Sequence, residues 1–241
     1  MKLLALVFAL AFALSLSGDI QVGDIYVQGQ PDRAYALVLE GHAINLQDWP
    51  GAVNGSLVLE AALGERVEIA VSVPPGAEPH TFHMHGHPWF APAVGRVVDT
   101  WLLKPGETHA FTIVAGGVDQ HAGDWMFHCH IGTHTAQGMW GVFRVYPFKT
   151  SVVPAPGGLT VTVDRLGTPL DDATLALTVD GAPLPAHVEA LGGGRYQMHA
   201  QLPATGALAI TAHSAAWGES VGRLALGGGA PLPVALPGHA H

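Results

Sequence analysis

Short apolar stretches alternate with turn residues along most of the chain. They are rich in β-branched and aromatic side chains, and glycine, proline and aspartate separate them at intervals of about ten residues. No longer window shows the period of about 3.6 residues that an amphipathic helix requires. The pattern predicts an all-β protein, and its regular spacing favours a sandwich or a barrel. The strands expected in the first half are residues 25–27, 35–39, 56–59, 67–73, 111–114 and 141–145.

A change in this pattern divides the chain. Residues 146–158 hold several prolines and glycines and show little alternation, which is typical of a linker. Alternating stretches return at residues 159–163, 173–179, 187–191, 196–202 and 208–212. We therefore predict a first domain over 18–147, a linker over 148–158, and a smaller immunoglobulin-like β-sandwich over 159–241 that ends in a flexible tail.

The first residues have the layout of a secretory signal. Met1-Lys2 precedes an apolar run over Leu3–Leu14, and small residues follow at Ser15–Gly18. The run is shorter than the roughly 20 residues that span a bilayer, and no later stretch is long enough to do so. We expect residues 1–17 to be a signal peptide, no membrane span after its removal, and a periplasmic or secreted protein. An uncleaved membrane anchor is the alternative.

Composition narrows the classes of function. Apolar residues make up 49% of the chain and charged residues 12%, which argues against a disordered protein. The net charge of −9 leaves no basic surface for a phosphate backbone, so nucleic acid is not an expected partner. A single cysteine excludes an internal disulfide framework and, among 15 histidines, raises the possibility of a metal ligand.

Histidines cluster in two segments of the first domain, His80–His87 and His128–His134. One thiolate, two imidazoles and a distant thioether form the ligand set of a blue-copper centre, whereas zinc more often recruits several cysteines or a carboxylate. Copper is therefore the expected cofactor. The histidines at 187, 199 and 213 are scattered singly and are expected to be structural, and those at 239 and 241 are not expected to form a site.

Strand alternation sorts these side chains into two sites. Successive side chains of a strand point to opposite faces, so an extended segment around Cys129 sends Cys129 to one face and His128 with His130 to the other. By the same alternation His83 and His85 share a face. We expect His80 to join Cys129, together with His134 and Met139 from the following turn, where Gly138 lets the backbone pass closely.

Residues 20–147 resemble the last cupredoxin domain of multicopper oxidases such as laccases. The resemblance lies in His80-x-x-His83-x-His85-Gly86-His87, in Trp125–Ile131 around Cys129, and in His134-x-x-x-Gly138-Met139. It implies a cupredoxin-like Greek-key β-sandwich or barrel and does not extend to the second domain.

The resemblance also implies roles for individual residues. His80, Cys129, His134 and Met139 would bind a type 1 copper, with the thiolate as the strong ligand and the thioether as the weak axial one. His83 resembles a type 2 ligand, and His85, His128 and His130 resemble ligands of a type 3 pair. His87 is expected to support the site without binding metal, and His109 and His121 match no position of the motif.

One departure from the family decides which functions are open. Multicopper oxidases complete a trinuclear cluster with two more His-x-His pairs from another domain, but His42 is the only histidine before position 80. This chain therefore offers four of the eight cluster histidines. Thr135 also stands where some bacterial members carry an acid that helps to relay protons.

Three interpretations follow. In the first, a homo-oligomer, a dimer or a trimer, assembles the cluster between chains and oxidises a small-molecule or protein electron donor with oxygen. In the second, the protein is a blue-copper electron carrier or a copper-binding or resistance protein without oxidase activity. In the third, the histidines are incidental. A copper nitrite reductase is disfavoured by the second histidine after Cys129, and no motif supports another enzyme class.

Overall fold

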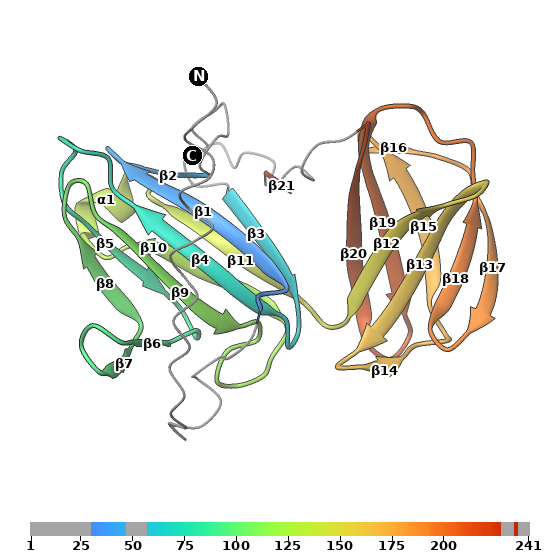
Figure 1. Ribbon diagram of the computed structural model, residues 1–241, viewed down its shortest axis with the longest axis horizontal. Helices are drawn as coiled ribbons and strands as arrows, with labels where there is room; N and C mark the ends of the chain where they lie inside the picture. The colour runs from blue at the N-terminus through green and yellow to red at the C-terminus, as the bar shows by residue number, and fades with distance from the viewer. Residues whose placement is uncertain (1–29, 47–56, 228–233, 236–241) are drawn as a thin grey trace.

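The computed structural model describes residues 30–46, 57–227 and 234–235, and it shows two β-sandwiches joined end to end (Figure 1). The all-β prediction is confirmed. Within the described ranges the only helix is α1 (Gly132–Ala136), a single short turn. The predicted signal peptide, the strand expected at 25–27 and the last six residues lie outside the described residues.

The first sandwich is built from two mixed sheets. The sheet with strand order β2-β1-β4-β9 contains β1 (Arg33–Glu40), β2 (Ala43–Leu46), β4 (Arg66–Ser72) and β9 (Thr108–Val114). The sheet with order β21-β3-β11-β10-β5-β8 contains β3 (Leu57–Ala62), β5 (His80–Met84), β8 (Thr100–Leu103), β10 (Gly123–Cys129), β11 (Trp140–Tyr146) and β21 (Val234–Ala235). A small hairpin pairs β6 (Trp89–Ala91) with β7 (Arg96–Val98).

Parallel pairing links strands that are distant in the sequence. β1 pairs with β4, and β3 pairs with β11, in parallel, so the chain crosses between sheets instead of turning back in hairpins. Alternating side chains of both sheets fill one core, which explains the inside-outside pattern of β4 and β9. The largest fully buried side chains of this core are those of Trp89, Phe82, Phe127 and Phe143.

The second sandwich has its own core. One sheet has the order β12-β13-β18-β17 with β14 attached, and contains β12 (Lys149–Ala155), β13 (Gly158–Arg165), β14 (Thr168–Pro169), β17 (His187–Gly192) and β18 (Arg195–His199). The other has the order β16-β15-β19-β20, and contains β15 (Thr174–Val179), β16 (Ala182–Pro183), β19 (Gly206–Ser214) and β20 (Gly218–Leu226). Phe148, Leu159 and Ile210 are among its fully buried residues.

The linker predicted over residues 148–158 is not a linker. Strand β12 occupies most of it and pairs antiparallel with β13, and only Pro147 and Phe148 separate β11 from β12. Pro154 had favoured a linker because proline is disfavoured in central strands. β12 lies at the edge of its sheet, where a residue without an N–H is tolerated.

The end of the chain also departs from the predicted boundary of the second domain. Val234 and Ala235 form β21, which pairs antiparallel with Val58 and Leu57 of β3 in the first sandwich. The chain therefore returns to the first sandwich after completing the second. A two-residue strand carries no alternation, so this pairing left no trace in the sequence pattern.

Charged side chains hold the two sandwiches together where β11 leads into β12. The buried carboxylate of Glu60, on β3, accepts hydrogen bonds from the Arg223 guanidinium on β20 at 2.6 and 2.9 Å and from the Tyr146 hydroxyl at 2.5 Å. Beside it, Lys149 lies 3.0 Å from Glu65, which also pairs with Arg33 at 2.5 Å. This junction fixes one sandwich against the other.

Candidate metal centres

Strands β5 and β10 bring the two histidine segments side by side. They pair antiparallel, with His83 opposite His128 and Phe82 opposite Cys129. His80 and Phe82 of β5, and Phe127 and Cys129 of β10, point into the core, while His83 and His128 point away from it. Helix α1 follows β10 directly and adds His134.

An inner group forms around Cys129. Its Sγ lies 3.8 Å from Nδ1 of His80 and 3.6 Å from Nδ1 of His134, and the two Nδ1 atoms are 3.3 Å apart. All three side chains are buried. These three donor atoms therefore converge on one point inside the sandwich.

Met139 lies next to this group. It is fully buried, and its backbone carbonyl oxygen accepts a hydrogen bond from the Cys129 N–H at 3.1 Å. Its own N–H donates to the His134 carbonyl at 3.0 Å, which closes the loop after α1. Gly138 precedes it with a φ of 100°, a backbone conformation that glycine adopts without strain.

The inner group suits a soft metal ion. Burial is the main cause that holds the pKa of His80 below its ordinary value of 6.5, and repulsion by the neighbouring His134 is the second. The His80 imidazole is therefore neutral and keeps a lone pair. One thiol and two imidazoles match the strong ligands of a blue-copper centre. The residues present therefore fit copper.

An outer group lies on the opposite side of β10. Donor atoms of His83, His85 and His128 fall within 4.8 Å of one another, and Nε2 of His85 is 3.2 Å from Nε2 of His128. The ring of His130, an exposed residue, lies 5.1 Å from that of His83. The four imidazoles thus meet at one partly exposed face.

Hydrogen bonds fix the orientation of the His83 and His128 rings. Nδ1 of His83 donates to the Asp99 carbonyl at 2.8 Å and lies 2.9 Å from the Thr100 hydroxyl. Nδ1 of His128 donates to the Cys129 carbonyl at 2.9 Å, and the Thr135 hydroxyl donates to the same oxygen. Because a carbonyl only accepts, both rings carry their proton on Nδ1, and Nε2 is left as the metal-binding atom.

Burial keeps three imidazoles of the outer group neutral. It holds the pKa values of His83, His85 and His128 below 6.5 and is the largest cause for each of them; neighbouring imidazoles add to it. Neutral imidazoles are the form that binds metal. These three side chains are therefore ready to bind metal without first losing protons at neutral pH.

His87 and His109 have other partners. Nδ1 of the buried His87 donates to the His85 carbonyl at 2.9 Å, and its Nε2 accepts the Gly116 N–H at 3.1 Å. This occupies both nitrogens and fixes the turn that presents His85. His109 accepts the Trp89 indole N–H at 3.0 Å and stacks on Trp101.

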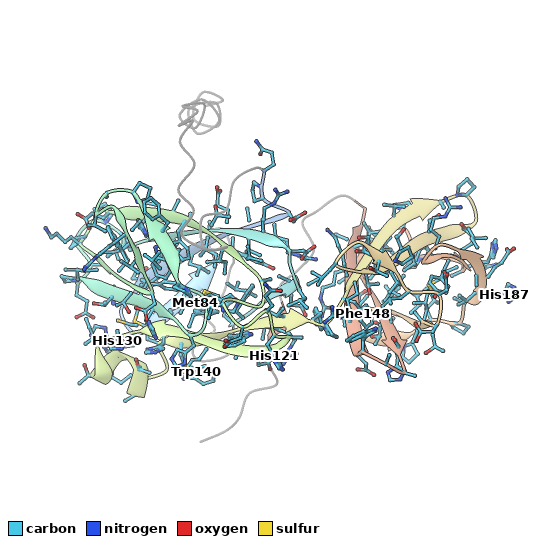
Figure 2. All side chains as sticks on the ribbon, turned by 90° about the horizontal axis from the view of Figure 1, so that it is seen from below. Met84, His121, His130, Trp140, Phe148 and His187 are labelled. Atoms are coloured by element: carbon cyan, nitrogen blue, oxygen red, sulfur yellow. The ribbon has the colours of Figure 1, made fainter. Side chains whose placement is uncertain are left out.

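Other histidines lie away from both groups. Figure 2 places His121 along the first sandwich toward the second, well away from His130. His187 and His199 stack on each other in the second sandwich, with ring centroids 6.1 Å apart.

A third group was not expected from the sequence. His42, Glu78 and His134 bring donor atoms within 4.8 Å of one another, and Nε2 of His134 lies 3.7 Å from the Glu78 carboxylate. His42 and Glu78 are exposed residues of two turns that are far apart in the sequence. Only their common position in the fold identifies them.

Comparison with known proteins identifies the first sandwich. The sequence model of the family described as multicopper oxidase matches residues 30–149. These residues form a multicopper oxidase-like cupredoxin domain. Copper is therefore the cofactor of the cupredoxin domain. Strand β12 and the rest of the second sandwich lie almost entirely beyond the match.

The relatives of the cupredoxin domain are much longer proteins. A probable nitrite reductase-hydroxylamine oxidoreductase fusion protein of Kuenenia stuttgartiensis is 30% identical over 48% of this chain, which spans 15% of that relative. Laccase-7 of Oryza sativa subsp. japonica is 30% identical over 43% of this chain, which spans 22% of the laccase.

A solved structure, the multi-copper oxidase of Pediococcus acidilactici, is 20% identical over 47% of this chain and 26% of its own, with a TM-score of 0.38. No helix in the described part of the chain is long and apolar enough to cross a membrane.

Proposed function

We propose that this chain is an exported copper-dependent oxidase that acts as a homodimer. A donor, a small molecule or a protein, would give single electrons at the inner group, and oxygen would be reduced at a cluster shared by two chains. Copper, when bound, supplies the one-electron chemistry. The ligands proposed for the inner, type 1 site are His80, Cys129, His134 and Met139, and those for the shared site are His83, His85, His128 and His130.

The gathering of four imidazoles on one partly exposed face carries this proposal. The partly buried rings of His83 and His128 lie beside the exposed rings of His85 and His130, and a metal ion would satisfy the ring nitrogens that face one another. Donor atoms of His83, His85 and His128 lie within 4.8 Å of one another, and Nε2 of His85 is 3.2 Å from Nε2 of His128. A two-fold axis through this face would add the same four side chains from a second copy and complete a set of eight.

The position of the face supports such a dimer. His130 lies toward the end of the first sandwich that is remote from the second one, whereas Phe148 lies at the junction (Figure 2). A second copy can therefore approach the face without meeting the second sandwich of the first copy.

Strand β10 connects the two proposed sites. Cys129 belongs to the inner group, and its chain neighbours His128 and His130 belong to the outer one. The Cys129 carbonyl accepts hydrogen bonds from His128 and Thr135, so the strand backbone joins both groups by covalent and hydrogen bonds. Cys129 is thus placed to pass electrons outward along a short bonded path.

A second candidate is an electron carrier or copper-binding protein without oxidase activity. Its support is that the inner group is complete within one chain and needs nothing from a partner. In that case the outer face would hold additional copper or dock a redox partner.

Copper counting combined with the mass of the particle in solution separates the candidates. The oxidase requires a dimer with about five copper ions, two inner and three shared between the facing histidines. A blue monomer with about one copper per chain would reject the oxidase and support the carrier.

A variant of the outer face sharpens this test. His85→Ala with His130→Ala removes two exposed rings and should abolish the dimer, the shared copper and oxygen consumption while leaving the blue colour. The control, His187→Ala with His199→Ala, removes an equally exposed stacked pair from the second sandwich. It should match the wild type in all four measurements; loss of the dimer in the control as well would contradict the proposed interface.

A further inference from the structure

Two tryptophans and a histidine pack together in the first sandwich, away from both histidine groups. Trp101 lies on β8 and His109 on β9, each an edge strand of its sheet, and their rings stack with centroids 4.2 Å apart at an angle of 10°. Trp89, on β6, is fully buried and donates its indole N–H to Nε2 of His109 at 3.0 Å. His109 therefore contacts both indoles.

The register of the sheet links these rings to the inner group. Cys129 of β10 pairs with Phe82 of β5, and Phe82 pairs on its other side with Trp101 of β8. The three side chains therefore lie in one row on the core face of the sheet. Because neighbouring strands are about 4.8 Å apart, the backbones of Cys129 and Trp101 are separated by roughly 10 Å. Phe82 also packs against Trp89, with ring centroids 6.3 Å apart.

The contacts of His109 suit it to take a proton from Trp89. Among the rings that pack here, indole loses an electron most readily, and an oxidised indole is a strong acid at its N–H. Burial holds the pKa of His109 below 6.5, so its Nε2 is an unprotonated base at hydrogen-bond distance from that N–H. The imidazolium that results would lie against the face of the Trp101 ring, which stabilises a positive charge.

We propose that Trp89, His109 and Trp101 form a redox relay that draws oxidising equivalents away from the inner group and protects Cys129 from oxidation. The oxidant is a partly reduced oxygen species, and its supply rests on the oxidase function proposed above. That species gains one electron from the Trp89 indole, and the indole N–H proton moves to Nε2 of His109. A reductant in solution then returns an electron through the half-buried Trp101, and His109 returns the proton.

Proton transfer is tested in the full metal-free chain, so that the outcome does not depend on copper. A light flash generates ruthenium(III) trisbipyridine, which removes one electron from an indole, and transient absorption follows the indole radicals as they lose their protons. The wild type should show a fast phase of deprotonation, because the Trp89 proton crosses a single hydrogen bond of 3.0 Å. The amplitude of this phase should fall at least fivefold in Trp89→Phe and in His109→Gln.

Two features of the variants keep this test specific. His109→Gln retains an acceptor for the Trp89 N–H but removes the base, so the packing is preserved, and far-ultraviolet circular dichroism checks the fold. The control, Trp217→Phe, removes an indole of the second sandwich that is 45% exposed and should keep the fast phase. A fast phase of wild-type amplitude in His109→Gln would overturn the proposal.

The protective role is tested in the copper-loaded protein. Each protein receives the same dose of hydrogen peroxide, and mass spectrometry measures the conversion of Cys129 to its sulfinic and sulfonic acids. Trp89→Phe with Trp101→Phe should at least triple this conversion, whereas Trp217→Phe should match the wild type. Equal conversion in the relay variant and the wild type would refute protection. A wild type that stays colourless at saturating copper but shows the fast phase would support the relay and reject only the type 1 site.

Discussion

Neighbouring residues belong to different groups of metal-binding side chains, the inner and the outer one, and the surroundings of each residue define its role. Cys129 is the only thiol, and it is fully buried where the imidazoles of His80 and His134 converge. His128, its neighbour in the chain, faces the other way and donates a hydrogen bond to the carbonyl of Cys129. One peptide unit therefore serves both groups.

Replacing the thiol tests the inner assignment. Cys129→Ser should abolish the intense blue absorption of the copper-loaded protein, because that colour requires a copper-thiolate bond, while the far-ultraviolet circular dichroism should be unchanged. Serine keeps the size of the side chain, so the sandwich core is preserved. A wild-type protein that stays colourless at saturating copper would contradict the type 1 assignment.

His109 makes stability depend on pH. Burial holds its pKa below 6.5, and its unprotonated Nε2 accepts the Trp89 N–H. Because the unfolded chain takes up the proton near pH 6.5 and the folded chain only at lower pH, acidification below that value favours unfolding. The metal-free protein should therefore have a smaller free energy of unfolding at about pH 5.5 than at about pH 7.5, measured by urea denaturation.

His109→Gln separates this contribution from that of other histidines. Glutamine retains an acceptor for the Trp89 N–H but does not titrate, so the fall in stability between the two pH values should be smaller in the variant. An identical pH dependence in both proteins would show that His109 stays unprotonated or does not matter.

Successive side chains of a strand point to opposite faces, and for this reason β10 contributes side chains to both the inner and the outer group. β10 sends Cys129 into the core and His128 outward, and its partner β5 does the same with Phe82 and His83. Any shift of register by one residue would exchange the two faces and destroy both groups. The pairing of β10 with β11 on its other side therefore holds the site in place.

Gly141 on β11 allows β10 to lie this close. A Cβ atom there would meet the Phe127 ring at 2.3 Å and the Leu57 carbonyl oxygen at 2.8 Å. Gly141→Ala should lower the free energy of unfolding by about 1–3 kcal/mol through overpacking, measured by urea denaturation. Gly132→Ala is the control: a Cβ at Gly132, in α1, meets nothing within 4 Å, so equal destabilisation by both changes would argue against a packing cause.

The whole molecule consists of two sandwiches that are joined by a network of charged side chains at their junction. Glu60 of the first sandwich is buried and accepts from Arg223 of the second at 2.6 and 2.9 Å. Strand β21 adds a backbone connection from the end of the chain to β3. Side-chain and backbone contacts thus both connect the two sandwiches.

Removing the Glu60 charge tests how much the ion pair with Arg223 contributes to stability. Glu60→Gln leaves the Arg223 guanidinium without its anion in a half-buried position and should cost about 1.5–3 kcal/mol of stability by urea denaturation. Asp124→Asn breaks a similar two-point pairing with Arg144 on the exposed surface and should cost about 0–1 kcal/mol. If the two variants lost equal stability, the junction would have no special role.

Sequence and structure agree best where the information is local. The fold class and most strands followed from alternation over a few residues, because a strand in a sandwich must bury every second side chain. The division of Cys129 from His128 followed from the same rule. The predicted linker was wrong because Pro154 lies in β12, an edge strand that tolerates proline, and the edge position depends on the tertiary fold.

The sequence by itself determined the residue types of the inner and outer groups and the face to which each β10 side chain points, since both depend on positions one or two residues apart. Only the tertiary structure decided which distant residues meet. His42 approaches His134, Arg223 reaches Glu60, and β21 returns to β3. Such contacts depend on how the sheets stack and cross, and no short-range pattern in the chain encodes them.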